Sequence, residues 1–68
     1  MNEETFNVSI RKFLKKVGIS SQREIEQAVN KAIEEGKLEG TETLPARMTL
    51  MVGDLNIKID FDGTIELE

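Results

Sequence analysis

KKVGISSQREIEQAV, residues 15–29, contains the point at which the fold is decided. Apolar residues recur at helical spacing before this stretch, and a second helical pattern begins within it. Gly18 separates the two patterns, and glycine often ends a helix because it adopts the left-handed C′ conformation without steric cost. Ser21 and Glu24 have the spacing of a capping box at a helix start. We therefore predict a helix, a short turn and a second helix.

The first predicted helix spans about residues 3–17, and the second spans about residues 22–35. Asn2 is the expected N-cap of the first helix, and Gly36 is expected to end the second. Each helix has one apolar face, and we expect these faces to be buried against each other and against a sheet. The faces consist of Phe6, Ile10, Phe13, Leu14 and Val17 in the first helix, and of Ile25, Ala28, Val29, Ala32 and Ile33 in the second.

From residue 48 onward the apolar residues alternate with polar ones, as in β-strands. Gly53-Asp54 has the composition of a two-residue hairpin turn, which would pair Leu50 with Ile57. A three-residue loop at residues 61–63 would place the next apolar residues on the same face as the first two strands, so we predict a third strand after it.

The predicted fold is therefore α+β. A two-helix hairpin packs on a three-stranded antiparallel meander in the order α-α-β-β-β, an arrangement that is winged-helix-like at most. A chain of 68 residues forms one small domain, residues 1–68. So short a chain buries only about 60% of its unfolded surface, and we expect the monomer to be marginally stable.

The composition argues against an enzyme and against a cofactor. The chain has no cysteine and no histidine, so it lacks thiolate ligands, the commonest zinc ligand and the commonest general base. The segment at residues 60–64, DFDGT, resembles the nucleophile motif of haloacid-dehalogenase phosphatases. Those enzymes need a parallel α/β domain after this motif, whereas only residues 65–68 follow here, so we interpret the segment as a hairpin turn.

The amino-terminal stretch MNEETF is acidic and polar, unlike a signal peptide. No apolar run approaches the roughly 20 residues of a membrane span. We expect a soluble, cytoplasmic protein of bacterial type, with no membrane partner.

The net charge of −4 is spread unevenly, because residues 1–20 carry +2 and residues 41–68 carry −4. An exposed valine among cations on the first predicted helix indicates a surface for an acidic protein, or for the acidic part of a second copy. Cations near a helix C-terminus also stabilise the helix itself, so a purely structural role is the alternative. The predicted partner surface consists of Val8, Arg11, Lys12 and Lys15.

A second interpretation is a winged-helix-like nucleic-acid-binding protein. The second predicted helix carries side chains of the types that read base edges. It also carries four glutamates, which would repel the phosphate backbone, so nucleic acid ranks below protein as a partner. The candidate nucleic-acid surface consists of Ser21, Gln22, Arg23, Gln27 and Asn30. A third interpretation places an anion at the same helix start, held by Ser20 and Ser21 beside Lys15 and Lys16.

The phrases NVSIRKFLKKVGISSQREIEQAV and LPARMTL resemble a family of short bacterial proteins of unknown function, over nearly the whole chain. The shared pattern includes Phe6, residues 9–15, Gly18, residues 21–24 and residues 44–46. The resemblance implies a stand-alone domain and carries no activity, cofactor or site. We predict a small non-enzymatic protein-interaction module that docks on another protein or on itself as a weak homodimer.

Overall fold

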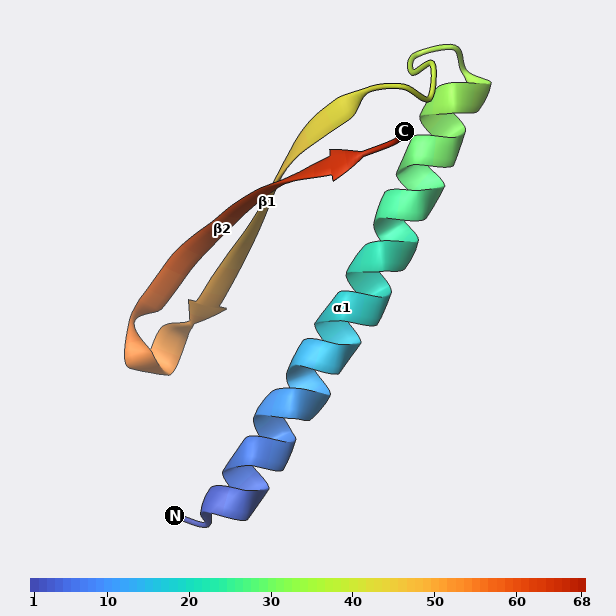
Figure 1. The fold of residues 1–68 in the computed structure, drawn as a ribbon. Coiled ribbons are helices and arrows are strands. Elements are labelled where there is room, and N and C mark those ends of the chain that lie inside the picture. The colour runs from blue at the N-terminus through green and yellow to red at the C-terminus, as the bar shows by residue number, and fades with distance from the viewer. The chain divides into compact units, whose positions relative to one another are not determined.

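The computed structural model describes residues 1–68 as one long helix followed by a β-hairpin (Figure 1). Helix α1 spans Glu3–Glu34, strand β1 spans Thr43–Val52, and strand β2 spans Ile57–Glu66. A short 3-10 helix, η1, covers Gly53–Leu55 between the strands. The chain forms two compact units, Met1–Lys37 and Leu38–Glu68.

The predicted order α-α-β-β-β is wrong, because the elements follow the order α-β-β. The two predicted helices are parts of one 32-residue helix that continues through Gly18 and both serines. A helix that stopped at Gly18 would need a second costly nucleus to restart, whereas extending it through one glycine costs only about 1 kcal/mol relative to alanine. Ser21 and Glu24 therefore lie in mid-helix, and the predicted helix–turn–helix and winged-helix-like arrangement do not form.

Both ends of α1 lie where the sequence predicts them. The Asn2 side chain accepts a hydrogen bond from the Thr5 backbone N–H at 3.0 Å, which confirms the N-cap. At the other end Gly36 has φ 74°, a left-handed conformation that favours glycine. The N–H of Lys37 donates to the carbonyl of Ala32 at 2.8 Å, and the N–H of Gly36 donates to that of Ile33 at 3.1 Å. These two bonds form a Schellman motif.

The hairpin is longer than predicted, and its connection begins at Gly53 as predicted but has four residues instead of two. Leu50 pairs with Ile59 rather than with Ile57, and Val52 pairs with Ile57. The connection is η1 followed by Asn56, whose φ of 54° is left-handed, a conformation that asparagine tolerates better than most residues. Because the shift in register is an even number of residues, the apolar side chains still share one face.

The predicted second turn at residues 61–63, and with it the third strand, is wrong. Strand β2 runs straight through this segment, and Gly63 pairs with Ala46 of β1. The two aspartates have partners across the hairpin: the Arg47 guanidinium contacts Asp62 at 2.6 Å, and the Thr49 hydroxyl donates to Asp60 at 2.8 Å. These cross-strand contacts hold an Asp-Gly sequence in a strand although its composition is typical of turns.

Neither unit has a hydrophobic core, since no side chain of the chain is buried. Phe13 and Ile33, both expected to be buried, are 52% and 41% exposed. One helix and one two-stranded sheet each present an apolar face, and neither element has a second layer of its own to cover that face. The faces that the sequence predicts therefore exist, but neither unit buries its own face.

The continuity of α1 is testable at Gly18. No atom lies within 4 Å of a Cβ added there, and its backbone is helical. We expect Gly18→Ala to stabilise the helix by about 1 kcal/mol, because alanine has the higher helix propensity. Circular dichroism should show unchanged or greater helicity and a higher midpoint of thermal unfolding.

A matched change, Gly36→Ala, serves as the control, because Gly36 has a positive φ that strains alanine. That variant should lose stability. A Gly18→Ala variant that lost stability as Gly36→Ala does would show that the chain turns at Gly18.

Candidate association surfaces

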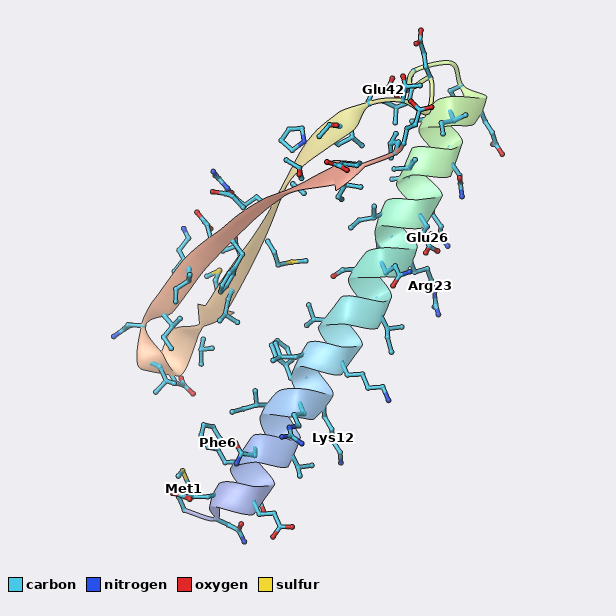
Figure 2. The ribbon with its side chains drawn as sticks, in the orientation of Figure 1. Met1, Phe6, Lys12, Arg23, Glu26 and Glu42 are labelled. Atoms are coloured by element: carbon cyan, nitrogen blue, oxygen red, sulfur yellow. The ribbon has the colours of Figure 1, made fainter.

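The apolar faces predicted for two helices join near Gly18 into one stripe that winds around α1, since Phe13 and Ile33 lie about 160° apart around the helix axis. Eleven residues of an α-helix rotate by about 20° beyond three full turns, at about 100° per residue. Leu14 therefore lies nearly in line with Ile25, and Val17 with Ala28, on the two sides of Gly18. Phe6 projects from one side of the helix, and Arg23 and Glu26 project from another (Figure 2). We define the helix stripe as Phe6, Ile10, Phe13, Leu14, Val17, Ile25, Ala28, Val29, Ala32 and Ile33.

The helix stripe is open to solvent for most of its length. Phe6 is 50% exposed and Leu14 is 55% exposed. Monomeric proteins seldom leave a continuous apolar strip of this kind uncovered, and such strips mark sites where another surface binds. The stripe is therefore the first candidate surface.

The hairpin carries a second apolar surface on one of its two faces. In the observed register, Met48 lies opposite Phe61 and Leu44 lies opposite Ile65. Because side chains alternate between the faces of a strand, all pairs of this set project to the same side. We define the hairpin face as Leu44, Ala46, Met48, Leu50, Val52, Ile57, Ile59, Phe61 and Ile65.

The other face of the hairpin is polar and accounts for the phosphatase-like segment. Asp60 and Asp62 project from it, each with its partner on β1. A nucleophilic aspartate and an acid aspartate would need to converge on one substrate position, whereas these two carboxylates lie along a single strand and bind their opposite neighbours. The segment resembles the motif in sequence only.

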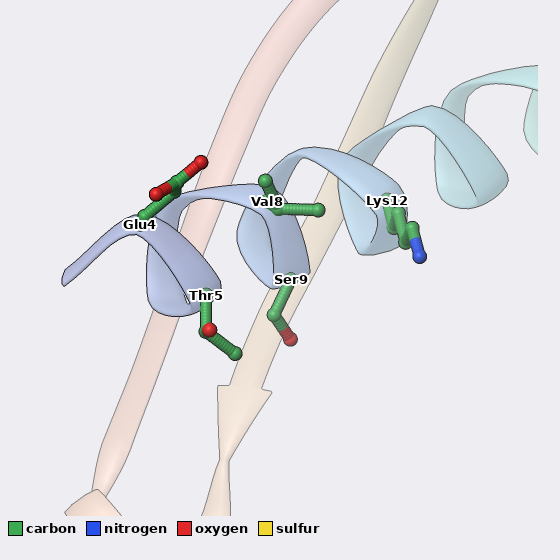
Figure 3. A pocket seen from close by; sticks show the side chains of 5 residues that line it. All are labelled: Glu4, Thr5, Val8, Ser9 and Lys12. Atoms are coloured by element: carbon green, nitrogen blue, oxygen red, sulfur yellow. The ribbon is translucent and has the colours of Figure 1, made fainter. Parts of the chain in front are cut away.

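The residues of the predicted partner surface all lie on α1. Val8 and Lys12 line a shallow depression on the first turns of the helix, together with Glu4, Thr5 and Ser9 (Figure 3). At about 100° per residue, Val8 and Lys15 project away from Ile10, and Arg11 lies at the edge of the helix stripe. The depression is formed by a single helix and is open, so it does not enclose a ligand.

The residues of the candidate nucleic-acid surface do not form a helix start. Ser21 lies within α1 on the side of the helix stripe, and the Gln22 amide donates to the Glu26 carboxylate at 2.9 Å. Backbone N–H groups are free to bind an anion only in the first turn of a helix. The predicted phosphate-binding position at Ser20 and Ser21 therefore has no free N–H groups, because it lies in mid-helix.

The segment before β1 contains an arrangement that the sequence analysis missed. The Glu42 carboxylate accepts hydrogen bonds from the backbone N–H groups of Glu39 at 2.8 Å, Gly40 at 2.9 Å and Thr41 at 3.1 Å. These donors, the Glu39 N–H foremost, hold the pKa of Glu42 below its ordinary value. The Glu42 carbonyl also accepts from the Leu67 N–H at 3.0 Å, so this residue joins the loop to the end of the hairpin.

No group of three or more acidic side chains is placed to hold a metal ion. None of the helices combines the length and the apolar composition needed to cross a membrane. The features that the structure does present are two extended apolar faces and one carboxylate-bound loop.

Comparison with known proteins places the chain in a family. The model of a family of unknown function, DUF6494, matches residues 1–68, and the chain belongs to this family. This confirms the resemblance that the sequence shows to short proteins of unknown function. No curated protein and no solved structure matches the chain.

The hydrogen bonds of Glu42 give the hairpin unit an expected response to acid. A carboxyl group whose pKa is lowered by folding stabilises the folded state above its unfolded pKa of about 4.3, and loses that effect as the pH falls through the lower folded pKa. The contribution of Glu42 should therefore be constant from neutral pH down to about 5 and disappear in more acidic solution. An NMR titration should give Glu42 a midpoint below the usual range for glutamate.

Glu42→Gln keeps the side-chain shape but removes the charge, so this variant should be less stable at neutral pH and should differ less from the wild type in acid. An ordinary titration midpoint for Glu42 would show that the loop does not hold its carboxylate.

Proposed function

We propose that this protein is a non-enzymatic association module that acts by binding another protein chain through its apolar faces. The observation that carries the proposal is the complete absence of buried side chains beside two extended apolar surfaces. Burying an aliphatic or aromatic side chain contributes about 1.5–3 kcal/mol, and the helix stripe and hairpin face hold many such side chains. Covering them is therefore the largest source of free energy that this chain can supply to binding.

The dimensions of the two faces support a partner outside the chain. A helix of 32 residues is about 48 Å long, and a strand of ten residues is about 33 Å long. The hairpin face is therefore too short to cover the whole helix stripe in any arrangement. The stripe itself runs from Phe6 to Ile33, about 40 Å, so at least about 7 Å of it remains for another surface.

The cations of α1 differ in what they can contribute to this binding, because they lie at different positions around the helix. Lys12 and Lys15 project away from Ile10 and would stay in solvent while the stripe is covered. Charges at the rim of an interface change association rates and partner selection more than affinity. Of the predicted partner surface, Val8, Arg11, Lys12 and Lys15, only Arg11 at the edge of the helix stripe is placed to steer an acidic chain toward the stripe.

Two matched substitutions test which face of α1 associates. Phe13→Glu places a charge in the helix stripe, and Val8→Glu places the same charge on the opposite side of the helix. In sedimentation equilibrium we expect Phe13→Glu to weaken association at least about tenfold, because it removes a buried aromatic side chain and desolvates a charge. Val8→Glu should change association by less than about threefold, which is the effect of a rim charge.

If the isolated chain does not self-associate, binding of the dye 8-anilinonaphthalene-1-sulfonate tests the proposal, because this dye reports exposed apolar surface. A monomer that bound the dye through the helix stripe would lose this signal on Phe13→Glu. A folded monomer that bound no dye would contradict the proposal, and an effect of Val8→Glu alone would move the interface to the opposite face.

A further inference from the structure

Helix α1 is far longer than its own unit requires. Helices in globular domains average about 10–14 residues, whereas α1 has 32 and carries an apolar stripe along its whole length. In proteins, a helix gains most of its stability from the packing of its apolar face against another surface. A surface equally long is needed to cover it, and α1 of a second copy is a surface of that length.

We propose that two copies of this chain pair through the helix stripes of α1, with the two helices antiparallel and their midpoints opposed. This inference rests on the proposed association function and adds the identity of the partner and its orientation. The midpoint of α1 lies between Gly18 and Ile19.

The charges along α1 distinguish the two orientations. Its first turn holds Glu3 and Glu4, and the stretch at residues 11–16 holds four cations and no acid. In a parallel pair, each of these blocks would lie level with its own copy, so Arg11 at the edge of the helix stripe would lie near the cations of the other copy and the two acids near its acids. Lys12 and Lys15 project away from the stripe and add repulsion only at longer range. Like charges opposite each other destabilise a helix pair.

An antiparallel pair relieves both conflicts. The cationic stretch then lies level with residues 21–26, in which one arginine and two glutamates give −1. The two acids of the first turn face the other end of the helix, where Lys31, Glu34, Glu35 and Lys37 sum to zero and Lys37 pairs with Glu35 at 3.5 Å. The dipoles of two antiparallel helices also attract each other, which favours this orientation by a smaller amount.

One pair of residues defines the arrangement. Arg11 and Glu26 are equally distant from the midpoint of α1, so they lie at the same level on opposite copies. Each also lies at an edge of the helix stripe, Glu26 within about 20° of Ile33 around the axis, so the two side chains can meet. Within one helix they are 15 residues and about 22 Å apart, too far for an ion pair. Any coupling between Arg11 and Glu26 must therefore arise between copies.

Distances between spin labels test the orientation. The chain contains no cysteine, so Arg23→Cys and Asn30→Cys each give one labelling position. Both positions lie on the side of α1 away from the helix stripe, seven residues apart and within about 20° of each other around the axis. In an antiparallel pair, the label-to-label distance at position 30 should exceed that at position 23 by about 15–20 Å. In a parallel pair the two distances would be equal, which would overturn the proposed orientation.

A charge exchange tests the register independently. Arg11→Glu alone should weaken the dimer about two- to tenfold, because two like-charged pairs form. Adding Glu26→Arg should restore the affinity of the wild type, and 1 M salt should reduce both effects. Double-variant dimers no tighter than those of Arg11→Glu would exclude the opposed midpoints.

The same samples separate this inference from the function on which it rests. A monomer that gives no dipolar coupling but binds 8-anilinonaphthalene-1-sulfonate through the helix stripe would overturn the second copy as partner and leave the association function in place. A monomer that binds no dye would overturn both.

Discussion

The structure depends on one constraint: the apolar surface of this chain exceeds what its own elements can cover. A stable domain packs at least two layers of secondary structure around a shared core. Here one helix and one two-stranded sheet each expose an apolar face, and no side chain is buried. The hydrophobic effect favours removing such faces from water, and this is the physical basis of the association proposed above.

The periodicity of the apolar residues predicted the apolar faces correctly. The residues that favour turns, glycine and the Asp-Gly pair, predicted the connections between elements wrongly. Spacing placed Ile10 and Phe13 on one side of a helix, and Leu50 and Ile59 on one face of a hairpin, as observed. Gly18 and the Asp62-Gly63 pair were interpreted as breaks, although both lie inside regular elements. Glycine and aspartate favour turns through local energies of about 1 kcal/mol, which are outweighed by an existing helix in one case and by Arg47 in the other.

Other features were out of reach of sequence reasoning for a different reason. The Glu42 carboxylate binds the backbone of the residues just before it, an arrangement that depends on loop dihedral angles and on Gly40 at φ 100°. No rule of residue spacing predicts these hydrogen bonds, and the only signal in the sequence is a glycine two residues before an acid. The predicted partner surface was located by charge alone, and charge does not distinguish a steering surface from a solvated helix side. The two-helix model also concealed the length of the stripe, which became apparent only once α1 proved continuous.

The continuity of α1 changes the physical meaning of its residues. In two short helices, the ten stripe residues would form two small faces that could pack against each other and fill a core within the chain. In one 32-residue helix they cannot meet, because a straight helix never brings its own two halves together. Each half can gain packing energy only from a surface outside the helix, which is either the hairpin face or another chain. Continuous helix through Gly18 therefore removes the core that two short helices would have formed by packing against each other.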